Sequence, residues 1–193
     1  MKRHSIVAFL ASVLVIAGIA IGGYSIIQIR QMNSSSGSQV LPELAHFPPH
    51  TGPNAMYASV KIRTGDYLGS ISIPALNERL PIYEGTAEAQ LKMGVGHFAG
   101  SVLPGLKDNS VLAGHRDSVF SHFGKLRLGD LLIVNTVAGK FTYKISGFRI
   151  VMADDRTVIV PTKTAVLTLS TCYPFRYFGN APKRYIVSAN LLD

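Results

Sequence analysis

A long apolar run near the start of the chain constrains its fold more than any other feature. No charged residue occurs from Ser5 to Gln28, and nearly every residue of Ile6–Ile27 is apolar. A helix of about 20 residues crosses the ~30 Å hydrocarbon core of a bilayer, so this run predicts a transmembrane helix. Lys2 and Arg3 precede it, which favours a cytoplasmic N-terminus and places the rest of the chain outside.

A cleaved secretory signal is the alternative interpretation of this run. The apolar region of such a signal is shorter, about 7–15 residues, and it ends at a small-residue cleavage site. No clear Ala-any-Ala sequence follows Gly22–Gly23. We therefore expect residues 1–28 to be a cytoplasmic stub and a retained membrane anchor.

Two further segments follow the anchor. Residues 29–57 are rich in serine and proline, which predicts a flexible linker with a span of roughly 30 Å. Residues 58–193 form short β-rich segments separated by Gly, Pro, Asn and Asp, and we expect one mainly β domain, a closed barrel or a sandwich. The predicted strands are Leu68–Ile73, Leu80–Tyr83, Asn109–Gly114, Leu131–Thr136, Lys140–Phe148, Val158–Val160, Ala165–Cys172 and Lys183–Ala189. The predicted short helices are Ala87–Gly94 and Ser118–Lys125.

Composition limits the kinds of site that the domain can carry. The chain contains one cysteine, which excludes an intrachain disulfide framework and a multi-cysteine zinc site. From residue 51 onward there are 16 basic and 10 acidic side chains, a net charge of +6. This charge favours attraction to an anionic envelope surface, and a solvated basic face is the alternative explanation.

The lone cysteine is the first candidate for chemistry. Cys172 ends a run of β-branched and apolar residues, and Pro174 follows two positions later, so the thiol is predicted at a strand end beside a loop. Free cysteine also occurs often as a small buried hydrophobe, and position alone does not separate the two roles. A nucleophilic role needs a neighbouring base or cation, because a free thiol with a pKa of about 8.5 is mostly protonated at neutral pH.

Three histidines of the β-rich domain are candidates for that base. His115 follows a short apolar strand that stops at Gly114, and catalytic groups collect at such strand ends. His97 lies in a glycine-rich turn, which also suits a histidine that packs or fixes a loop. His122 lies on a predicted short helix and resembles a surface residue. We therefore rank His115 first.

Acyl transfer also needs a donor for the oxyanion that develops at the attacked carbonyl. Arg184 begins the last predicted strand, and the guanidinium would approach Cys172 if the two strands are neighbours. Its planar fork suits a carbonyl oxygen better than an ammonium does. A solvated strand-end charge is the alternative role, and Arg176 and Lys183 are rival donors.

Three segments resemble a known family. Thr168-Leu-Ser-Thr-Cys172 resembles the Thr-Leu-any-Thr-Cys signature of sortases, the membrane-anchored cysteine transpeptidases of Gram-positive bacteria. Ala113-Gly-His-Arg-Asp117 is similar to their histidine motif, and the stretch from Cys172 to Arg184 is similar to the segment that joins their nucleophile and arginine. The resemblance covers nearly all of residues 66–190. Its details are most similar to the class D group, notably Cys172–Phe175, Gly179–Pro182 and Gly94–His97.

The resemblance implies a fold and an activity. The expected fold is a closed eight-stranded sortase-type β-barrel with two or more short helices, preceded by one transmembrane helix. The expected activity is cleavage of a Leu-Pro-any-Thr-Gly/Ala sorting signal after Thr, through a thioacyl intermediate, with transfer to an amine of a cell-wall precursor. The implied partners are surface proteins that carry the signal, the peptidoglycan precursor and the cell membrane. No cofactor, metal or nucleic acid is implied.

The resemblance also assigns roles to residues. Cys172 would be the nucleophile, His115 the acid and base, and Arg184 the donor to the carbonyl. The residues implied to contact the substrate are Ala113, Thr171 and Tyr173. We expect Asp117 to pair with Arg116 rather than to orient the histidine. Apolar residues of the following loop would shield the thioester from water, with plain packing at the barrel edge as the equal alternative: Phe175, Tyr177 and Phe178.

Departures from other sortase classes narrow the expectation. The chain has no Asp-Pro dipeptide of the kind found in the lid of pilin-polymerising sortases. Met152–Thr164 is too short for the long helix that class B enzymes insert before the cysteine strand. The alternatives left open are a secreted cysteine peptidase that only hydrolyses, a pilin-polymerising sortase, and a membrane-tethered binding module without activity.

Overall fold

The computed structural model describes residues 52–177, 179 and 181–192, which belong to a unit spanning Pro49–Asp193. The predicted membrane anchor, residues 1–28, and most of the predicted linker lie outside the described residues. No helix within the described ranges has the length and apolar character needed to span a membrane.

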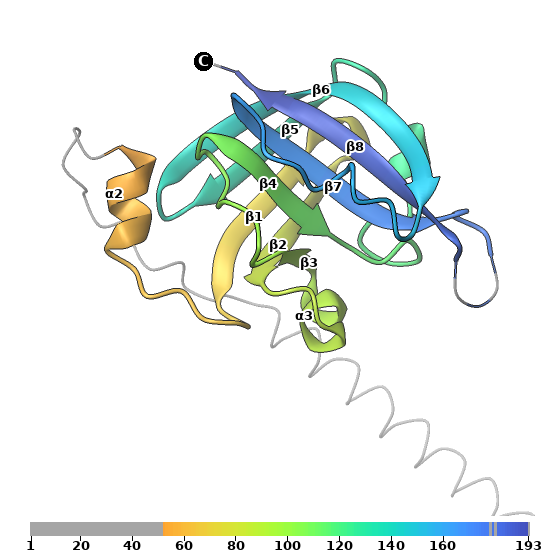
Figure 1. Ribbon diagram of the computed structural model, residues 1–193, viewed down its shortest axis with the longest axis horizontal. Helices are drawn as coiled ribbons and strands as arrows, with labels where there is room; N and C mark the ends of the chain where they lie inside the picture. Colours follow the sequence, from red (N-terminus) through yellow and green to blue (C-terminus); the bar gives the residue numbers. More distant parts are fainter. Residues whose placement is uncertain (1–51, 178, 180, 193) are drawn as a thin grey trace, which may run out of the picture. The chain divides into compact units, whose positions relative to one another are not determined.

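Eight strands close into a barrel in the order β1-β2-β3-β4-β7-β8-β6-β5 (Figure 1). The strands are β1 (Tyr67–Ile73), β2 (Glu78–Glu84), β3 (Val95–His97), β4 (Asp108–Ala113), β5 (Leu131–Thr136), β6 (Gly139–Met152), β7 (Ala165–Tyr173) and β8 (Lys183–Leu191). The short helices are α2 (Pro53–Ala58), α3 (Glu88–Met93) and the 3₁₀ turns η1 (Pro74–Leu76) and η2 (Phe123–Lys125). This arrangement confirms the predicted mainly β fold and its closed eight-stranded barrel.

Two features of the pairing place the site. The pairs β2–β3 and β4–β7 are parallel and the others are antiparallel, so β4 and β7 end at the same edge of the sheet. Strand β6 is long: residues 139–144 pair with β5, whereas its second half pairs only with β8. The barrel therefore closes where the two pairings of β6 overlap, at Tyr143 and Lys144.

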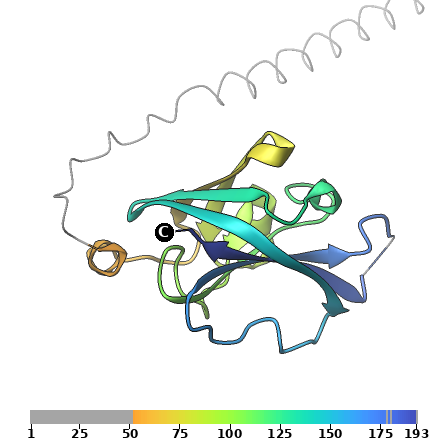
Figure 2. The ribbon, with the colours of Figure 1, turned by 90° about the horizontal axis from the view of Figure 1, so that it is seen from above.

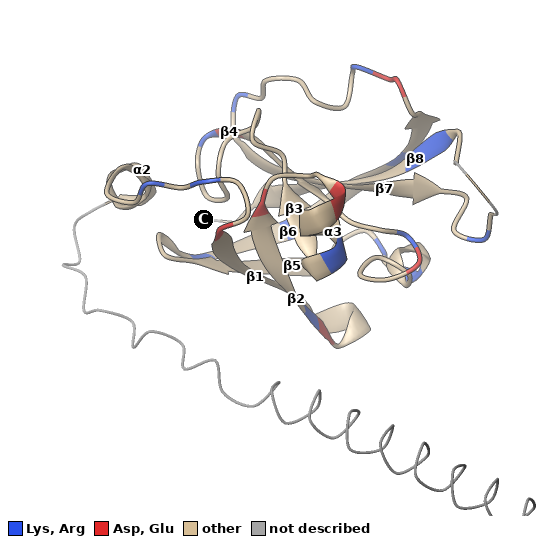
Figure 3. Cartoon of the chain, turned by 90° about the horizontal axis from the view of Figure 1, so that it is seen from below, with Lys and Arg blue, Asp and Glu red and all other residues tan. Residues whose placement is uncertain are grey.

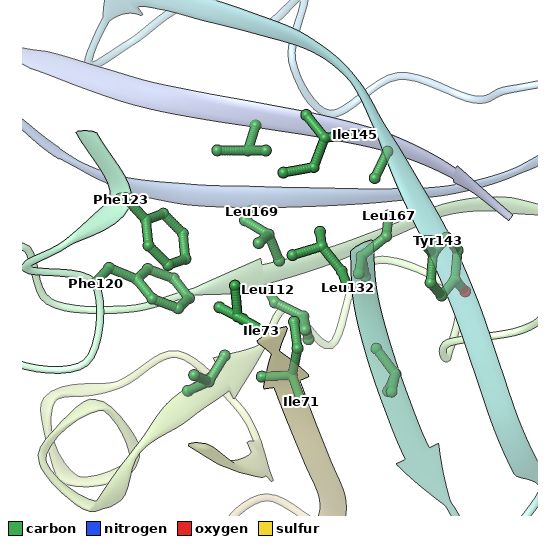
Figure 4. Close-up of a cluster of buried hydrophobic side chains, with 14 of the residues drawn as sticks. Ile71, Ile73, Leu112, Phe120, Phe123, Leu132, Tyr143, Ile145, Leu167 and Leu169 are labelled. Atoms are coloured by element: carbon green, nitrogen blue, oxygen red, sulfur yellow. The ribbon is translucent and has the colours of Figure 1, made fainter. Parts of the chain in front are cut away.

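Every strand contributes buried apolar side chains to the barrel interior (Figure 4). Phe120 and Phe123 stack with their ring centroids 3.8 Å apart and lie at one end of the cluster, near Leu169. Tyr143 lies at the other end, where its hydroxyl accepts a hydrogen bond of 2.7 Å from the backbone N–H of Gly105. Burial of this phenol raises its pKa to about 12.

The end of the predicted linker is structured. Pro53 occupies the first turn of α2, where its missing N–H costs no hydrogen bond. Tyr57 is buried, and its hydroxyl donates to the carbonyl of Pro104 at 2.8 Å while lying 2.8 Å from the hydroxyl oxygen of Thr136. Burial raises the pKa of Tyr57 to about 12. These contacts tie α2 to the barrel.

Two predicted elements differ from the structure, and one strand was not predicted. Val158–Val160 is not a strand, because the carbonyls of Val158 and Val160 accept hydrogen bonds from the side chain of Asn109 instead of from a neighbouring strand. Ser118–Lys125 is helical only in its last three residues, the 3₁₀ turn η2, and the residues before them form turns. The three-residue strand β3 was not predicted; its central Gly96 allows close packing, since a Cβ there would lie 2.4 Å from the carbonyl oxygen of Gly85.

Candidate active site

The thiol of Cys172 lies at the end of a barrel strand. Leu167 and Leu169 of β7 belong to the core, and because side chains alternate along a strand, Cys172 faces outward with Ser170. Cys172 is a free, half-buried cysteine. The strand thus presents the sulfur on the outer surface of the barrel, with partial shielding from water.

Arg184 lies directly opposite Cys172. Strands β7 and β8 are antiparallel neighbours, and their register pairs Cys172 with Arg184. Opposed residues of such a pair have Cα atoms about 4.5–5.5 Å apart and side chains on the same face. The condition that the sequence argument placed on Arg184 is therefore met. Figure 3 shows its basic segment at the start of β8 in blue.

The guanidinium of Arg184 is held by the backbone that precedes it. Its Nη1 donates to the carbonyl of Ala181 at 3.1 Å and to the carbonyl of Lys183 at 3.0 Å. These bonds use one nitrogen of the fork. The other two nitrogens, Nε and Nη2, have no hydrogen-bond partner among residues 52–177, 179 and 181–192, so they can donate to a carbonyl oxygen.

His115 reaches the same edge from the parallel strand β4. The last pair in the β4–β7 register joins Ala113 to Ser170, and the backbone N–H of Gly114 donates to the Ser170 carbonyl at 3.1 Å. His115 and Cys172 each follow that pair by two residues. The imidazole is one-third exposed, at 32%, and its Nε2 lies 3.6 Å from a carboxylate oxygen of Glu88 on α3.

Two of the three residues implied to contact the substrate, Ala113 and Thr171, lie on opposite faces of the sheet. Ala113 is half-buried and, like Ser170, lies on the outer face beside Cys172. The side chain of Thr171 is buried on the opposite face, where its hydroxyl donates to the Gly114 carbonyl at 2.7 Å. Thr171 therefore ties the end of the cysteine strand to the residue before His115. Direct binding of substrate by these residues remains a prediction.

The role of Thr171 was missed from the sequence. A threonine inside a β-rich run is typical of a strand, and nothing in its spacing indicates a bond to Gly114. Glu88 was missed as well, because it precedes His115 by 27 positions on a separate helix. Only the fold brings these groups together.

The other two histidines have separate partners. His97 is 2% exposed; its Nδ1 lies 2.7 Å from a carboxylate oxygen of Glu84, and its Nε2 lies 3.0 Å from the carbonyl oxygen of Val102. This agrees with the prediction that His97 could fix a loop. His122 is exposed and pairs with Glu78 at 2.7 Å.

The expected pair between Arg116 and Asp117 is wrong. The Nη2 of Arg116 donates to the carbonyls of Tyr177 and Gly179, at 2.7 Å and 3.1 Å. Its guanidinium carbon also lies 5.8 Å from the centroid of the Tyr177 ring. These contacts join the residue after His115 to the loop after Cys172.

Aromatic side chains pack beneath this loop. Phe175 contacts the rings of Tyr173 and Tyr185, with centroid separations of 5.7 Å and 5.2 Å. Burial, followed by the nearby Tyr173 phenol, raises the pKa of Tyr185. Of the residues predicted to shield the thioester, Phe175 packs against the core, Tyr177 is exposed, and Phe178 lies outside the described residues.

The arrangement favours acyl transfer. A thiol, an imidazole and a guanidinium at one sheet edge could serve as nucleophile, proton carrier and oxyanion donor. Within the part of the chain that the structure describes, no three His, Cys, Asp or Glu side chains gather closely enough to hold a metal ion.

Comparison with known proteins agrees with this chemistry. The family model of the sortase domain matches residues 71–192. The chain belongs to the sortase family. It is similar to Sortase D of Bacillus subtilis, with 40% identity over 185 residues that cover 90% of this chain and 93% of that protein. Sortases are cysteine transpeptidases, and the chain carries the one cysteine that this activity requires.

Solved sortase structures share the barrel. A Clostridium perfringens Sortase D5 transpeptidase aligns with a TM-score of 0.65 and 27% identity, covering 75% of this chain and 91% of that one. Clostridium perfringens sortase C with its C-terminal cell wall sorting motif aligns with a TM-score of 0.63 and 34% identity, covering 69% and 74%. The sortase-type barrel predicted from the motifs is therefore confirmed.

Proposed function

We propose that this sortase cleaves a Leu-Pro-any-Thr-Gly/Ala sorting signal after Thr and transfers the carried protein to a cell-wall precursor amine. The observation that carries the proposal is the direct pairing of Cys172 with Arg184 at the edge where His115 follows β4. A sorting motif accompanies the sortase C structure named above, which supports a sorting peptide as the substrate class. The 40% identity to a Sortase D supports assignment to class D.

The first step forms a thioester. The Cys172 thiolate attacks the threonine carbonyl, and the electron pair of the C=O bond moves to its oxygen. Nε and Nη2 of Arg184, with the backbone N–H of Tyr173, would stabilise that oxyanion. When the intermediate collapses, the C–N bond breaks and protonated His115 gives its proton to the departing amine, since an unprotonated amide nitrogen is a poor leaving group.

The second step reverses the proton flow. The acceptor amine attacks the thioester, His115 takes its proton, and Cys172 leaves as thiolate. Transfer exceeds hydrolysis only if water is kept from the thioester until the amine arrives. The hydrogen bonds from Arg116 to the carbonyls of Tyr177 and Gly179 would hold the loop between β7 and β8 over the site.

The location of the enzyme is part of the proposal. Residues 6–27 would anchor the chain in the cell membrane by a single span, with a cytoplasmic N-terminus. The barrel would then lie outside the cell, where surface proteins and peptidoglycan precursors meet. Protease added to intact cells should digest the barrel if this topology holds, and a barrel cleaved only after lysis would contradict it.

The activity is tested with the full chain in detergent micelles. Peptides containing Leu-Pro-any-Thr-Gly or Leu-Pro-any-Thr-Ala are incubated with candidate amines, and the products are identified by mass spectrometry. We expect a ligated product joined through threonine, and none with Cys172→Ala. Hydrolysis without ligation at saturating amine would favour the peptidase alternative. Ligation only to a lysine side chain of a pilin subunit would favour the polymerising alternative.

A further inference from the structure

The two ends of the barrel differ in what they carry (Figure 2). The candidate site lies at one end, where β4 and β7 finish and β8 begins. At the other end β4 and β7 begin, β5 turns into β6, and β8 finishes. Helix α2 lies at this second end, because the hydroxyl of Tyr57 contacts that of Thr136 at the end of β5. The described part of the chain also starts here, with Gly52 directly before α2.

Five exposed basic side chains gather at the α2 end without an ion pair. They come from the coil after α2, the segments just before β4 and β7, and the start of β6: Lys61, Arg63, Lys107, Lys140 and Lys163. None of the five forms an ion pair within the part of the chain that the structure describes. Figure 3 shows the blue segments of the coil that follows α2. The charges of these side chains are therefore open to a partner.

Little negative charge offsets them. Asp66 is exposed, and one of its carboxylate oxygens accepts from the backbone N–H of Arg63 at 2.8 Å. Asp108 is half-buried, and one of its oxygens accepts two backbone N–H groups, at 2.6 Å and 2.8 Å. The α2 end thus presents a strong excess of positive charge to its surroundings.

Exposed apolar side chains adjoin these cations. Val60, Tyr67 and Val137 are 44%, 53% and 44% exposed, and they line a hollow of about 270 Å³ beside the start of β1. Lys61 directly follows Val60, and Lys140 lies on the same β5–β6 turn as Val137. Lysine and arginine beside tyrosine and aliphatic groups are the composition that binds the interface of an anionic membrane. We call these three apolar residues and the five basic ones the basic face.

We propose that the basic face docks on the surface of an anionic phospholipid bilayer. Its lysine and arginine side chains contact lipid phosphates, and Val60, Tyr67 and Val137 enter the headgroup region. This inference rests on the membrane location proposed above and goes beyond it, because the barrel itself makes a second contact with the lipid. The edge with Cys172 lies at the other end of the barrel and points away from the membrane.

Charge argues against two other occupants of the basic face. A second copy would set the same cations against one another, because a two-fold interface places identical patches together. Residues 29–51 contain a single acidic residue, Glu43, which is too little to neutralise five cations. A phospholipid surface supplies negative charge over a whole plane, and each basic group near it strengthens binding about fivefold.

The test places one fluorescent label at either end of the barrel. Cys172 is the single cysteine of the chain, so Cys172→Ala combined with Val137→Cys gives one labelling position on the basic face. Cys172→Ala combined with Ser121→Cys is the matched control, because Ser121 is exposed and follows Phe120, whose N–H donates to the His115 carbonyl. Each labelled full chain is reconstituted in vesicles that contain a headgroup quencher. The vesicles are phosphatidylcholine alone or a mixture with phosphatidylglycerol.

We expect the label at position 137 to be quenched about threefold or more strongly when phosphatidylglycerol is present. The label at position 121 should be quenched weakly and equally in both kinds of vesicle. Salt at about 1 M shortens the Debye length to ~3 Å and should abolish the difference at position 137. The salt measurement needs no further substitution, so it does not depend on the folding of a charge variant.

Charge variants locate the contact. Neutralising three cations of the basic face should remove the effect of phosphatidylglycerol: Lys61→Gln, Arg63→Gln and Lys140→Gln. A matched triple variant changes the net charge equally at exposed residues outside the basic face, and should keep the effect: Lys125→Gln, Arg127→Gln and Arg156→Gln. Equal loss in the two triple variants would overturn the inference, because net charge alone would then explain the attraction.

Other outcomes separate this inference from the proposed function. Chains that float with both kinds of vesicle but show equal quenching at position 137 would overturn the inference and leave the anchor standing. A label at position 137 that is shielded from an aqueous quencher in detergent micelles, and unquenched by lipid, would also overturn it and indicate that protein fills the hollow. Flotation only with phosphatidylglycerol would overturn the anchor and support the basic face, whereas flotation with neither would overturn both. The peptide assay tests the proposed activity separately.

Discussion

Hydrogen bonds from single side chains fix the ends of strands in this barrel. His97 has an acceptor at each ring nitrogen, because Nε2 can only donate to the Val102 carbonyl and Nδ1 faces the Glu84 carboxylate. This buried pair joins β2 and β3 to the loop before β4. The exposed pair of His122 and Glu78 has similar chemistry and a different environment.

Replacing His97 by alanine should therefore destabilise the protein strongly. The substitution leaves a buried carboxylate without a partner, and breaking such a pair costs about 3–5 kcal/mol. Urea unfolding gives the change in the free energy of unfolding. His122→Ala serves as the matched control, since exposed pairs contribute about 0–1 kcal/mol. Equal losses in the two variants would contradict the burial argument.

Thr171 should affect activity through His115. Thr171→Val removes the hydroxyl that bonds the Gly114 carbonyl, so the backbone before His115 loses its tie to the cysteine strand. We expect kcat to fall about tenfold, the cost of roughly one hydrogen bond to a buried carbonyl. Thr171→Ser keeps the hydroxyl and should restore most of the rate. A serine variant as slow as the valine variant would argue against this role.

The pairing of strands brings the candidate catalytic residues to one edge of the sheet. The antiparallel pair β7–β8 sets Cys172 against Arg184, and the parallel pair β4–β7 brings His115 to the same edge. Parallel neighbours share the direction of their ends, so two motifs 57 positions apart meet without a further connection. These pairings make the site a property of the sheet rather than of a loop.

Arg184→Ala should lower kcat by about 10²- to 10³-fold, the usual effect of removing one oxyanion donor. Arg184→Lys keeps the charge but loses Nε and Nη2, the two nitrogens of the fork that do not bond the Ala181 and Lys183 carbonyls, and we expect it to recover little. Steady-state kinetics with a sorting peptide measures both. Arg176 is an exposed arginine of the loop between β7 and β8, and Arg176→Ala should stay near the wild-type rate.

Most strands could be predicted from the sequence, but the way in which they pair could not. Ala165–Cys172 and Leu131–Thr136 carry long β-branched runs, so local composition is sufficient to predict them. Val95–His97 is too short and too rich in glycine to give a pattern. Residues 158–160 have the composition of a strand but do not form one. Their carbonyls accept hydrogen bonds from the side chain of Asn109 instead of from the backbone of a neighbouring strand.

At the scale of the whole molecule, buried phenols connect distant segments. Tyr57 joins α2 to the barrel, and Tyr143 joins β6 to the loop before β4. The motifs of the sequence predicted the barrel class and the three candidate catalytic residues. They could not predict Thr171, Glu88 or Asn109 as supports, because those contacts depend on three-dimensional register.

The raised pKa values of the two buried tyrosines predict a loss of stability in strong alkali. Burial raises the pKa of Tyr57 and Tyr143 from 10.0 to about 12, so the unfolded chain releases their protons first as pH rises. Stability is fully present below pH ~10 and should fall by about 1.4 kcal/mol per tyrosine for each pH unit between ~10 and ~12. Urea unfolding at a series of pH values measures the slope, and Tyr57→Phe should reduce it by about half. A slope unaffected by that substitution would contradict the assignment.

The change of neighbour along β6 has a consequence for its amide hydrogens. Beside Val151, Arg184 and Cys172 the sheet is three strands wide, since the pairing of β6 with β5 reaches only to Lys144. Tyr143 and Lys144 are flanked by strands on both sides, whereas residues 147–152 have a strand partner on one side only. Amide hydrogens of residues 147–152 should therefore exchange with deuterium sooner than those of Tyr143 and Lys144, and equal rates would show that the missing neighbour does not loosen the strand.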